Sequence, residues 1–168
     1  RDPEMSRGLG DVYKRQLRDT LNARDESHEC ALLLVDIDNM KRMNDELGKL
    51  VGDMFLENVA EFLTSIFRGS DIIGRVGGDE FMVYVRNLKS EDWLAGKCSR
   101  IQHEIKAISN ENGNINMTCS IGAAVAGKVP VSFEQMYTQA DDSLYKAKTR
   151  GRDKYVLHYV HKEREVIH

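Results

Sequence analysis

The sequence predicts an α/β fold in which a mixed central β-sheet is flanked by helices. Three observations lead to this prediction: an apolar run of strand length, several segments with apolar residues at helical spacing, and two short β-rich stretches joined by a Gly-Gly pair. The expected order along the chain is strand, helix, helix, hairpin, helix, strand, helix, strand. Because an antiparallel hairpin interrupts the βαβ alternation, this order argues against a doubly wound Rossmann fold.

The first strand is predicted at Cys30 to Ile37, a near-continuous apolar run of the kind that is buried on both faces of a sheet. The run ends in acidic residues, which is typical of a strand that opens into a site. A short helix is expected over residues 39–47. A second helix is expected over residues 52–67, where apolar residues recur at intervals of three and four along one buried face.

A hairpin is predicted next along the chain. Asp71 to Val76 and Glu80 to Arg86 are two short β-rich stretches, and Gly77 and Gly78 separate them. A Gly-Gly pair supplies the positive φ angles that a tight turn requires. We therefore expect two antiparallel strands here.

The second half of the chain contains two further helices and two further strands. Serines open both helices: Ser90 is an expected N-cap, and Ser132 forms a capping box with Gln135. Strict alternation of apolar residues predicts the first of the two strands, and Gly151 is expected to end the last helix. The four elements are predicted at residues 90–109, 115–121, 132–149 and 154–160.

Composition limits the class of protein. The chain has 168 residues, 41% of them hydrophobic and 30% charged, with a formal net charge of −3. This is the size of one soluble domain, which can bury about 70% of its unfolded surface. The acidic balance gives no reason to expect a nucleic-acid polymer as partner, and no apolar run approaches the roughly 20 residues of a membrane span. Three scattered cysteines predict buried thiols in a reducing compartment, which favours a cytoplasmic domain, even if its parent protein is membrane-anchored.

The first residues differ from the rest of the chain. Arg1 to Gly10 mixes charge, Pro and Gly without an apolar period, and RGLGDVYKRQ looks like a translated adaptor tail. We therefore interpret residues 1–16 as a non-native or disordered segment, with order beginning near Val12. A single domain is expected over residues 17–160, followed by a tail at 161–168.

Acidic residues at a strand end and at the hairpin could bind a divalent metal. Asp36 and Asp38 lie at the end of the first strand, and Asp79 and Glu80 follow the two glycines. A hard cation such as Mg²⁺ takes oxygen ligands, usually one or two carboxylates with phosphate and water, and the backbone oxygen of Ile37 could add another. The alternative for Asp38 is a helix cap. Asp and Glu are depleted in half-buried strands, so the hairpin acids favour a functional site.

Four blocks of this sequence resemble the GGDEF domain family of diguanylate cyclases. They are LLLVDIDNMKRMNDELGKLVGDMFL, RGSDIIGRVGGDEF, MTCSIGAAVA and QADDSLYKAKTRGRDKY. The resemblance covers about residues 17–160 and implies the palm-like fold that this family shares with nucleotidyl cyclases. It also implies a reaction in which a homodimer condenses two GTP molecules to cyclic di-GMP and releases two pyrophosphates.

The resemblance assigns roles to individual residues. Asp36, the Ile37 carbonyl and Glu80 would hold Mg²⁺, with Mn²⁺ as a possible substitute, and Asp79 and Glu80 would be catalytic. Asn44 and Asp53 match the guanine-binding positions, and a carboxylate suits N1 and N2 of guanine. The remaining substrate-binding positions, which contact phosphate or let it approach the backbone, are Lys41, Gly77, Gly78, Lys148 and Arg152. Apart from the resemblance, Asn44 and Asp53 could be helix caps, and Lys148 and Arg152 solvated cations near a helix end.

Arg68 and Asp71 match the family's product-inhibition site, where cyclic di-GMP would bind away from the catalytic edge. An Arg can pair with phosphate or stack on guanine, and Asp71 could accept from the guanine edge. The alternative is a local salt bridge, and Arg75 is a weaker candidate.

Three functions remain open at this point. The first is a diguanylate cyclase domain that belongs to a longer protein with an upstream sensor. The second is a catalytically silent domain that binds GTP or cyclic di-GMP as a receptor. The third is a related nucleotidyl cyclase or polymerase with another product, which GGDEF at 77–81 with Asn44 and Asp53 disfavours.

Overall fold

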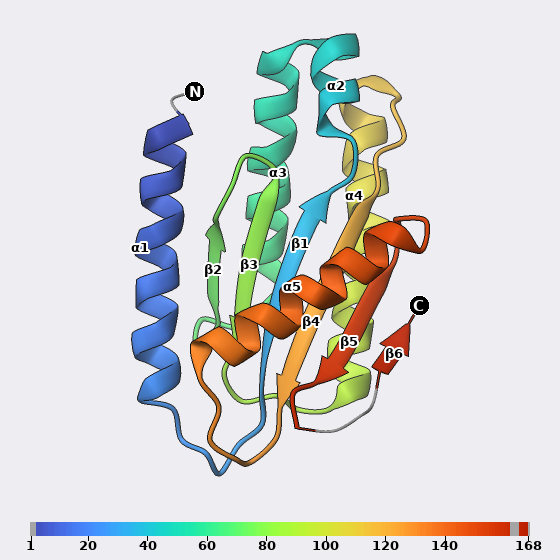
Figure 1. The fold of residues 1–168 in the computed structure, drawn as a ribbon. Coiled ribbons are helices and arrows are strands. Elements are labelled where there is room, and N and C mark those ends of the chain that lie inside the picture. The colour runs from blue at the N-terminus through green and yellow to red at the C-terminus, as the bar shows by residue number, and fades with distance from the viewer. Residues whose placement is uncertain (1–2, 162–164, 168) are drawn as a thin grey trace.

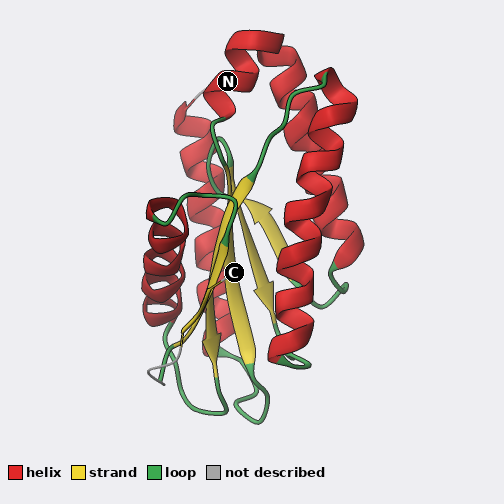
Figure 2. Ribbon diagram, turned by 90° about the vertical axis from the view of Figure 1, so that its right-hand side faces the viewer, coloured by secondary structure: helices red, strands yellow, loops and turns green. Residues whose placement is uncertain are grey.

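The structure is a computed structural model, and it describes residues 3–161 and 165–167. A mixed sheet of six strands in the order β2-β3-β1-β4-β5-β6 lies between two layers of helices (Figures 1 and 2). The fold class predicted from the sequence is therefore confirmed. The helices are α1 Pro3–Asn22, α2 Met40–Leu47, α3 Lys49–Ile66, α4 Glu91–Gly113 and α5 Phe133–Thr149, and the strands are β1 Cys30–Ile37, β2 Ile72–Arg75, β3 Glu80–Val85, β4 Cys119–Ala126, β5 Tyr155–Tyr159 and β6 Glu165–Ile167.

The central strand β1 divides the core into two parts. Its odd-numbered residues, such as Leu33 and Val35, pack in a cluster with α3 and α4. Its even-numbered residues, Leu32 and Leu34, pack in a second cluster with α1 and α5. All eight residues of β1 are buried, as the continuous apolar run predicts.

β1 pairs antiparallel with both β3 and β4, whereas β4 pairs parallel with β5. The parallel pair requires a crossover, which α5 supplies across the front of the sheet in Figure 1. As a result, the end of β1, the β2–β3 turn and the end of α5 all lie toward the upper end of the sheet in Figure 1. Residues that are far apart in the chain meet at this end of the sheet.

One predicted strand lies elsewhere than expected. The alternating residues 115–121 predict a strand, but β4 spans Cys119–Ala126. Every residue of β4 is buried, so it shows no alternation, whereas Ile115 and Met117 are buried in the loop before it. Gly122 lets α5 lie directly on β4, because a Cβ there would stand 2.2 Å from the backbone nitrogen of Leu144.

The helix caps follow the sequence closely. The Ser90 side chain accepts a hydrogen bond from the Trp93 backbone N–H at 3.0 Å. Ser132 and Gln135 form the predicted capping box, with bonds of 2.9 and 3.1 Å. Gly151 follows the end of α5 with a φ of 112°.

The geometry predicted for the hairpin turn is wrong. Among the described residues, Gly48 and Gly151 are the glycines with positive φ, so Gly77 and Gly78 do not have the left-handed conformation. The reason is the length of the loop: Arg75 pairs with Phe81, and the Val76 N–H donates to the Glu80 carbonyl at 2.9 Å. Longer hairpin loops are commonly built around a type I turn, which needs no such pair.

The two ends of the chain also differ from expectation. α1 begins at Pro3, not near Val12, and its residues Leu17 and Leu21 lie in the core. The strand β6 lies within the predicted tail 161–168 and pairs with β5. Parts of the predicted segment 1–16 and of that tail, at 1–2, 162–164 and 168, lie outside the described residues. Whether residues 1–16 are non-native stays a prediction.

No helix in the described part of the chain combines the length and the apolar character that a membrane span requires. The three cysteines have free thiols and are buried, as predicted: Cys30, Cys98 and Cys119.

Candidate functional site

Two carboxylates face each other across neighbouring strands at the top of the sheet. Asp36, near the end of β1, pairs with Glu80, the first residue of β3. Next to them, the Ile37 N–H donates to the Asp79 carbonyl at 3.0 Å, so this neighbouring pair is the hydrogen-bonded one. Asp36 and Glu80 consequently form a non-hydrogen-bonded pair, the type whose Cα atoms are only about 4.5 Å apart. The register thus brings the two predicted metal-binding carboxylates together.

Both carboxylates lie on the side of the sheet that α5 covers. They continue the even-numbered rows of β1 and β3 that pack against α5 lower in the sheet. Lys148, near the C-terminal end of α5, forms an ion pair with Asp36 through its Nζ. Asp36 is 8% exposed, and its Oδ1 is buried without a hydrogen-bond partner among the described residues.

The electrostatics of this cluster disfavour its negative charge. Burial raises the pKa of Asp36, and the charges of Asp79 and Asp38 add to this effect, although Lys148 opposes it. Burial also raises the pKa of Glu80, as do the charges of Asp36 and Asp141. For Lys148, burial is the largest single influence and lowers the pKa, but the hydrogen bond with Asp36 and the negative charges of Asp36, Glu80 and Asp79 together outweigh it and raise the pKa. A bound cation would relieve the repulsion between the carboxylates.

The residues present fit a magnesium ion that is shared with a ligand. Within residues 3–161 and 165–167, no three His, Cys, Asp or Glu side chains gather closely enough to hold a metal alone. Mg²⁺ usually binds one or two carboxylates together with substrate phosphates and water. Two adjacent carboxylates, one with an unpartnered oxygen on Asp36, match this requirement.

Asp38 has a different environment from Asp36. Its carboxylate accepts hydrogen bonds from Thr118 Oγ1 and Ser120 Oγ, both at 2.7 Å, and from the Asp153 N–H at 3.2 Å. The N-cap of α2 is Asn39, so the alternative that Asp38 caps this helix is wrong. Asp38 joins β1 to β4 and to the turn after α5. The alternating hydroxyl residues Thr118 and Ser120 are the sequence signal for this role of Asp38, which was not among the expectations above.

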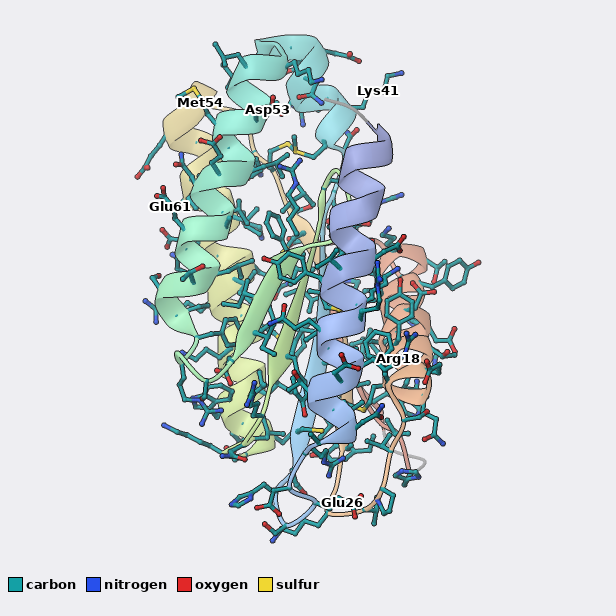
Figure 3. The ribbon with its side chains drawn as sticks, turned by 90° about the vertical axis from the view of Figure 1, so that its left-hand side faces the viewer. Arg18, Glu26, Lys41, Asp53, Met54 and Glu61 are labelled. Atoms are coloured by element: carbon teal, nitrogen blue, oxygen red, sulfur yellow. The ribbon has the colours of Figure 1, made fainter. Side chains whose placement is uncertain are left out.

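The predicted guanine-binding residues lie on α2 and α3. Asn44 lies on α2, and its Oδ1 stands 2.0 Å from the position that a Cβ on Gly52 would occupy. Asp53 follows Gly52 on α3 and is half-buried. The structure therefore places Asn44 beside the turn of α3 that carries Asp53. Figure 3 shows Asp53 and the exposed Lys41 at the same end of the molecule.

The hairpin turn is held by Arg75. Its guanidinium Nε donates to the carbonyls of Gly77 at 3.2 Å and Gly78 at 3.1 Å. A Cβ at Gly78 would meet nothing within 4 Å, and one at Gly77 would make only ordinary contact with Glu80. Neither packing nor φ requires glycine at these two positions, and the missing Cβ atoms leave the backbone of the turn open to close approach.

Arg152 lies in the turn that follows α5. Its guanidinium Nε is 4.0 Å from Asp38 Oδ1, and its side chain is 61% exposed. Arg152 and Asp153 both have left-handed backbone angles, with φ of 60° and 49°. The two predicted phosphate-binding cations, Lys148 and Arg152, thus reach Asp36 and Asp38, the two acids of the β1 end.

Arg68 and Asp71 form a closed pair away from these carboxylates. The Asp71 side chain is 0% exposed and accepts bonds from the Arg68 backbone at 3.0 Å and from Arg68 Nε at 3.3 Å. It also accepts from the Arg86 N–H. The Arg68 guanidinium lies over the Trp93 ring at 5.2 Å and is 32% exposed. In this structure Arg68 is accessible to a ligand, whereas the oxygens of Asp71 are occupied.

The molecule is thus an α/β domain with a mixed sheet, and two carboxylates meet at one end of that sheet. A model of the family described as diguanylate cyclase, GGDEF domain, matches residues 11–154, and the chain belongs to this family. It is similar to Diguanylate cyclase DgcS of Shewanella oneidensis, with 34% identity over 154 residues that cover 89% of this chain and 50% of that protein. It is also similar to Diguanylate cyclase A of Treponema denticola, with 34% identity over 82% of this chain and 38% of that protein.

Solved structures give the same family. A microbial GGDEF domain studied with cyclic di-GMP has a TM-score of 0.72 and 29% identity, covering 91% of this chain and 89% of that one. The diguanylate cyclase SiaD of Pseudomonas aeruginosa, solved with its activator SiaC, has a TM-score of 0.69 and 26% identity, covering 95% and 61%. The chain spans half or less of the length of the two curated relatives.

Proposed function

We propose that this domain is a diguanylate cyclase, which condenses two GTP molecules to cyclic di-GMP and releases two pyrophosphates. The observation that carries this proposal is the Asp36–Glu80 pair beside Lys148, at the strand end where the GGDEF hairpin turns. Two carboxylates for a cation and a lysine for phosphate are what phosphoryl transfer needs, because its catalysis is mostly positioning and charge stabilisation. The names of the curated relatives support the same reaction.

Asp36 and Glu80 would hold Mg²⁺ or Mn²⁺, with the Ile37 carbonyl oxygen as a further ligand. When bound, the ion offsets triphosphate charge and activates or aligns the attacking 3′-hydroxyl. Lys148 and Arg152 bind phosphate oxygens with charge-assisted hydrogen bonds, and the exposed Lys41 adds a third cation. Asp79 assists as ligand or base. Gly77 and Gly78 let the nucleotide approach the turn, since neither has a Cβ.

Asn44 and Asp53 select guanine in this proposal. A carboxylate accepts from N1 and N2 of guanine, and adenine would leave Asp53 without a partner. An unpaired buried polar group costs about 1–3 kcal/mol, which corresponds to about a ten- to hundredfold preference for GTP. Their positions on adjoining turns of α2 and α3 allow both to contact one base.

Catalysis would require a homodimer. Cyclic di-GMP contains two equivalent nucleotides, and each must be attacked by the 3′-hydroxyl of the other. The Asp36–Glu80 pair of one chain provides for one triphosphate. Two copies that face each other would bring two such sites together, and an upstream sensor in the parent protein would control this encounter.

Arg68 and Asp71 would form the product-inhibition site. Arg68 is the member that can contact cyclic di-GMP directly, because it is partly exposed and already stacks on an aromatic ring. Asp71 holds the Arg68 backbone and guanidinium in place unless ligand binding opens the pair. This site also supports a second candidate function, a silent domain that serves as a receptor for cyclic di-GMP.

The test incubates the protein with GTP and Mg²⁺ and separates the products by chromatography. We expect cyclic di-GMP from the native chain and none from Glu80→Gln. The matched control is Glu61→Gln on the exposed face of α3 (Figure 3), which should leave turnover unchanged. Cyclic di-GMP binding without turnover would support the receptor function, and a linear or single-nucleotide product would contradict both.

A further inference from the structure

We propose that Asp38 is a positioning residue, not a metal ligand, and that it fixes the turn after α5 so that Arg152 faces the triphosphate. The inference rests on the proposed function, because Arg152 is a phosphate-binding residue only there. Asp36 and Asp38 stand two positions apart at one strand end and look equivalent in sequence. The structure assigns them different tasks.

The two carboxylates differ in how fully their oxygens are used. Asp38 is 7% exposed, its Oδ1 accepts from Ser120, and its Oδ2 accepts from Thr118 and from the Asp153 N–H. The Oδ1 of Asp36, in contrast, is buried and has no partner among the described residues. A cation would satisfy Asp36, but on Asp38 it would have to displace bonds already formed.

The segment that Asp38 holds has an unfavourable backbone. Gly151, Arg152 and Asp153 have φ values of 112°, 60° and 49°, three successive left-handed residues of which two carry side chains. Such conformations persist only where surrounding contacts enforce them. The contacts here are the Arg152 N–H to the Ala147 carbonyl at 3.0 Å, the Asp153 N–H to Asp38, and Lys106 Nζ to Asp153 Oδ2 at 2.7 Å.

This anchoring determines where the Arg152 side chain lies. Its guanidinium is 4.0 Å from Asp38 Oδ1, yet 61% of the side chain is exposed, so the charge is oriented while most of its donors stay available. A guanidinium with available donors suits a phosphate oxygen, which it can bind bidentately. Because Lys148 reaches Asp36 from the same helix end, the two cations bracket the strand end where the phosphates would lie.

The first experiment measures the turn without any ligand. Hydrogen exchange of the Asp153 amide is compared between the native chain, Asp38→Asn and Ser120→Ala. In Asp38→Asn the added amide group opposes the donors that surround it, so we expect Asp153 to exchange at least about tenfold faster. Ser120→Ala keeps the bond to Asp153 and should change exchange less than about twofold. Equal exchange in the native chain and Asp38→Asn would overturn the proposal.

The second experiment measures nucleotide binding and turnover. With α,β-methylene-GTP, which cannot release pyrophosphate, we expect Asp38→Asn and Arg152→Ala each to weaken binding by about tenfold, and the double variant to be no weaker than either. KM for GTP should rise more than kcat falls, and the Mg²⁺ concentration that gives half-maximal rate should stay unchanged. A shifted Mg²⁺ requirement would identify Asp38 as a metal ligand. If the affinity losses of the two single variants multiplied in the double variant, Asp38 and Arg152 would act independently. Either result would overturn the proposal.

A further variant guards against an Asp38 substitution that fails to fold. Lys106→Met, at a partly exposed position of α4, releases the same turn from its other anchor. It should raise both Asp153 exchange and KM for GTP by about threefold, and unchanged values would contradict the proposal. If the native chain did not bind GTP at all, the proposed function would fail, while the exchange result would still decide whether Asp38 holds the turn.

Discussion

Asp36 and Glu80 are placed where their own ionisation is unfavourable. Burial comes first among the causes that raise both pKa values, and the repulsion between neighbouring acids adds to it. A carboxyl whose pKa is raised in the folded state stabilises the fold only while it is protonated. As pH rises past the unfolded-state pKa, the unfolded chain ionises first and stability falls, until the folded group has ionised too. At neutral pH the site therefore lowers the stability of the empty domain.

Replacing Glu80 should show directly how much its ionised carboxylate destabilises the empty domain. Glu80→Gln keeps the shape of the side chain and removes the charge, so in EDTA at pH 7 we expect a Tm higher by about 2–4 °C, equivalent to ~1 kcal/mol. The gain should shrink as pH falls through the ordinary value of 4.5, where the native carboxyl is protonated as well. The measurement is a calorimetric scan at several pH values with Glu61→Gln as control. A lower Tm for Glu80→Gln would refute this account of the site.

Gly52 offers a test of the Asn44 position. A Cβ at residue 52 would lie 2.0 Å from Asn44 Oδ1, which is the end of a flexible side chain, so Gly52→Ala should displace Asn44 without unfolding the protein. Ala is preferred over Gly inside a helix by about 1 kcal/mol, so Tm should stay constant or rise. We expect KM for GTP to increase about tenfold while the Tm holds, as one lost hydrogen bond to the base implies. Unchanged KM would remove Asn44 from the site.

Individual residues were predictable from sequence to different degrees. Asp36 and Glu80 stand at the ends of strands that local sequence patterns identify. Their proximity could therefore be predicted by assuming that these two strands are neighbours in the sheet. Asp38 could not be interpreted in this way, because its partners Thr118, Ser120 and Asp153 lie 80, 82 and 115 positions away. Whether the oxygens of a buried carboxylate already accept all their hydrogen bonds depends on residues that are distant in sequence and that only the fold brings near.

At the level of elements, local signals predicted helices better than strands. The serine caps of α4 and α5 are encoded within four residues, and the structure reproduces both. β4 was misplaced because burial on both faces removes the alternation on which a strand prediction depends. The turn at Gly77 and Gly78 was wrong because loop length, not composition, decides the turn type.

The close packing of α5 on β4 can be tested for its effect on stability and on the candidate site. A Cβ on Gly122 would lie 2.2 Å from Leu144 N and 2.3 Å from the Ala140 carbonyl oxygen, both rigid backbone atoms. Gly122→Ala should push α5 away and destabilise the domain by about 2–3 kcal/mol, or about 4–12 °C in Tm. Because α5 carries Lys148, KM for GTP should rise as well.

The matched control for this prediction is Gly96→Ala in α4. A Cβ at Gly96 would meet nothing within 4 Å, so this variant should keep or raise the Tm and leave KM unchanged. Thermal unfolding and steady-state kinetics measure Tm and KM for the two variants. If Gly122→Ala were as stable as the native chain, α5 would not be held at the distance that the structure indicates.

At the scale of the whole molecule, the sequence predicted the element order and the mixed α/β class but not the strand order. The neighbours of β1 are β3 and β4, and β4 pairs with β5 in parallel only because α5 crosses the sheet between them. No local pattern contains this information. The arrangement also separates the two predicted ligand sites, since the carboxylates lie at one end of the sheet and Arg68 lies at the far end of β2, joined to Asp71 and to the Asn87 carbonyl.

Two separate sites should give two separable thermal responses. A ligand at 100 times its Kd stabilises by about 2.7 kcal/mol, which corresponds to about 5–10 °C for a chain of this size. We expect shifts of this order with cyclic di-GMP and with α,β-methylene-GTP plus Mg²⁺. Arg68→Ala should reduce the first shift to about half or less and retain the second, whereas Asp53→Ala should reduce the second shift to the same degree and retain the first. Loss of both shifts in one variant would mean that the two ligands share a single site, and the assignment of Arg68 to product binding would then be wrong.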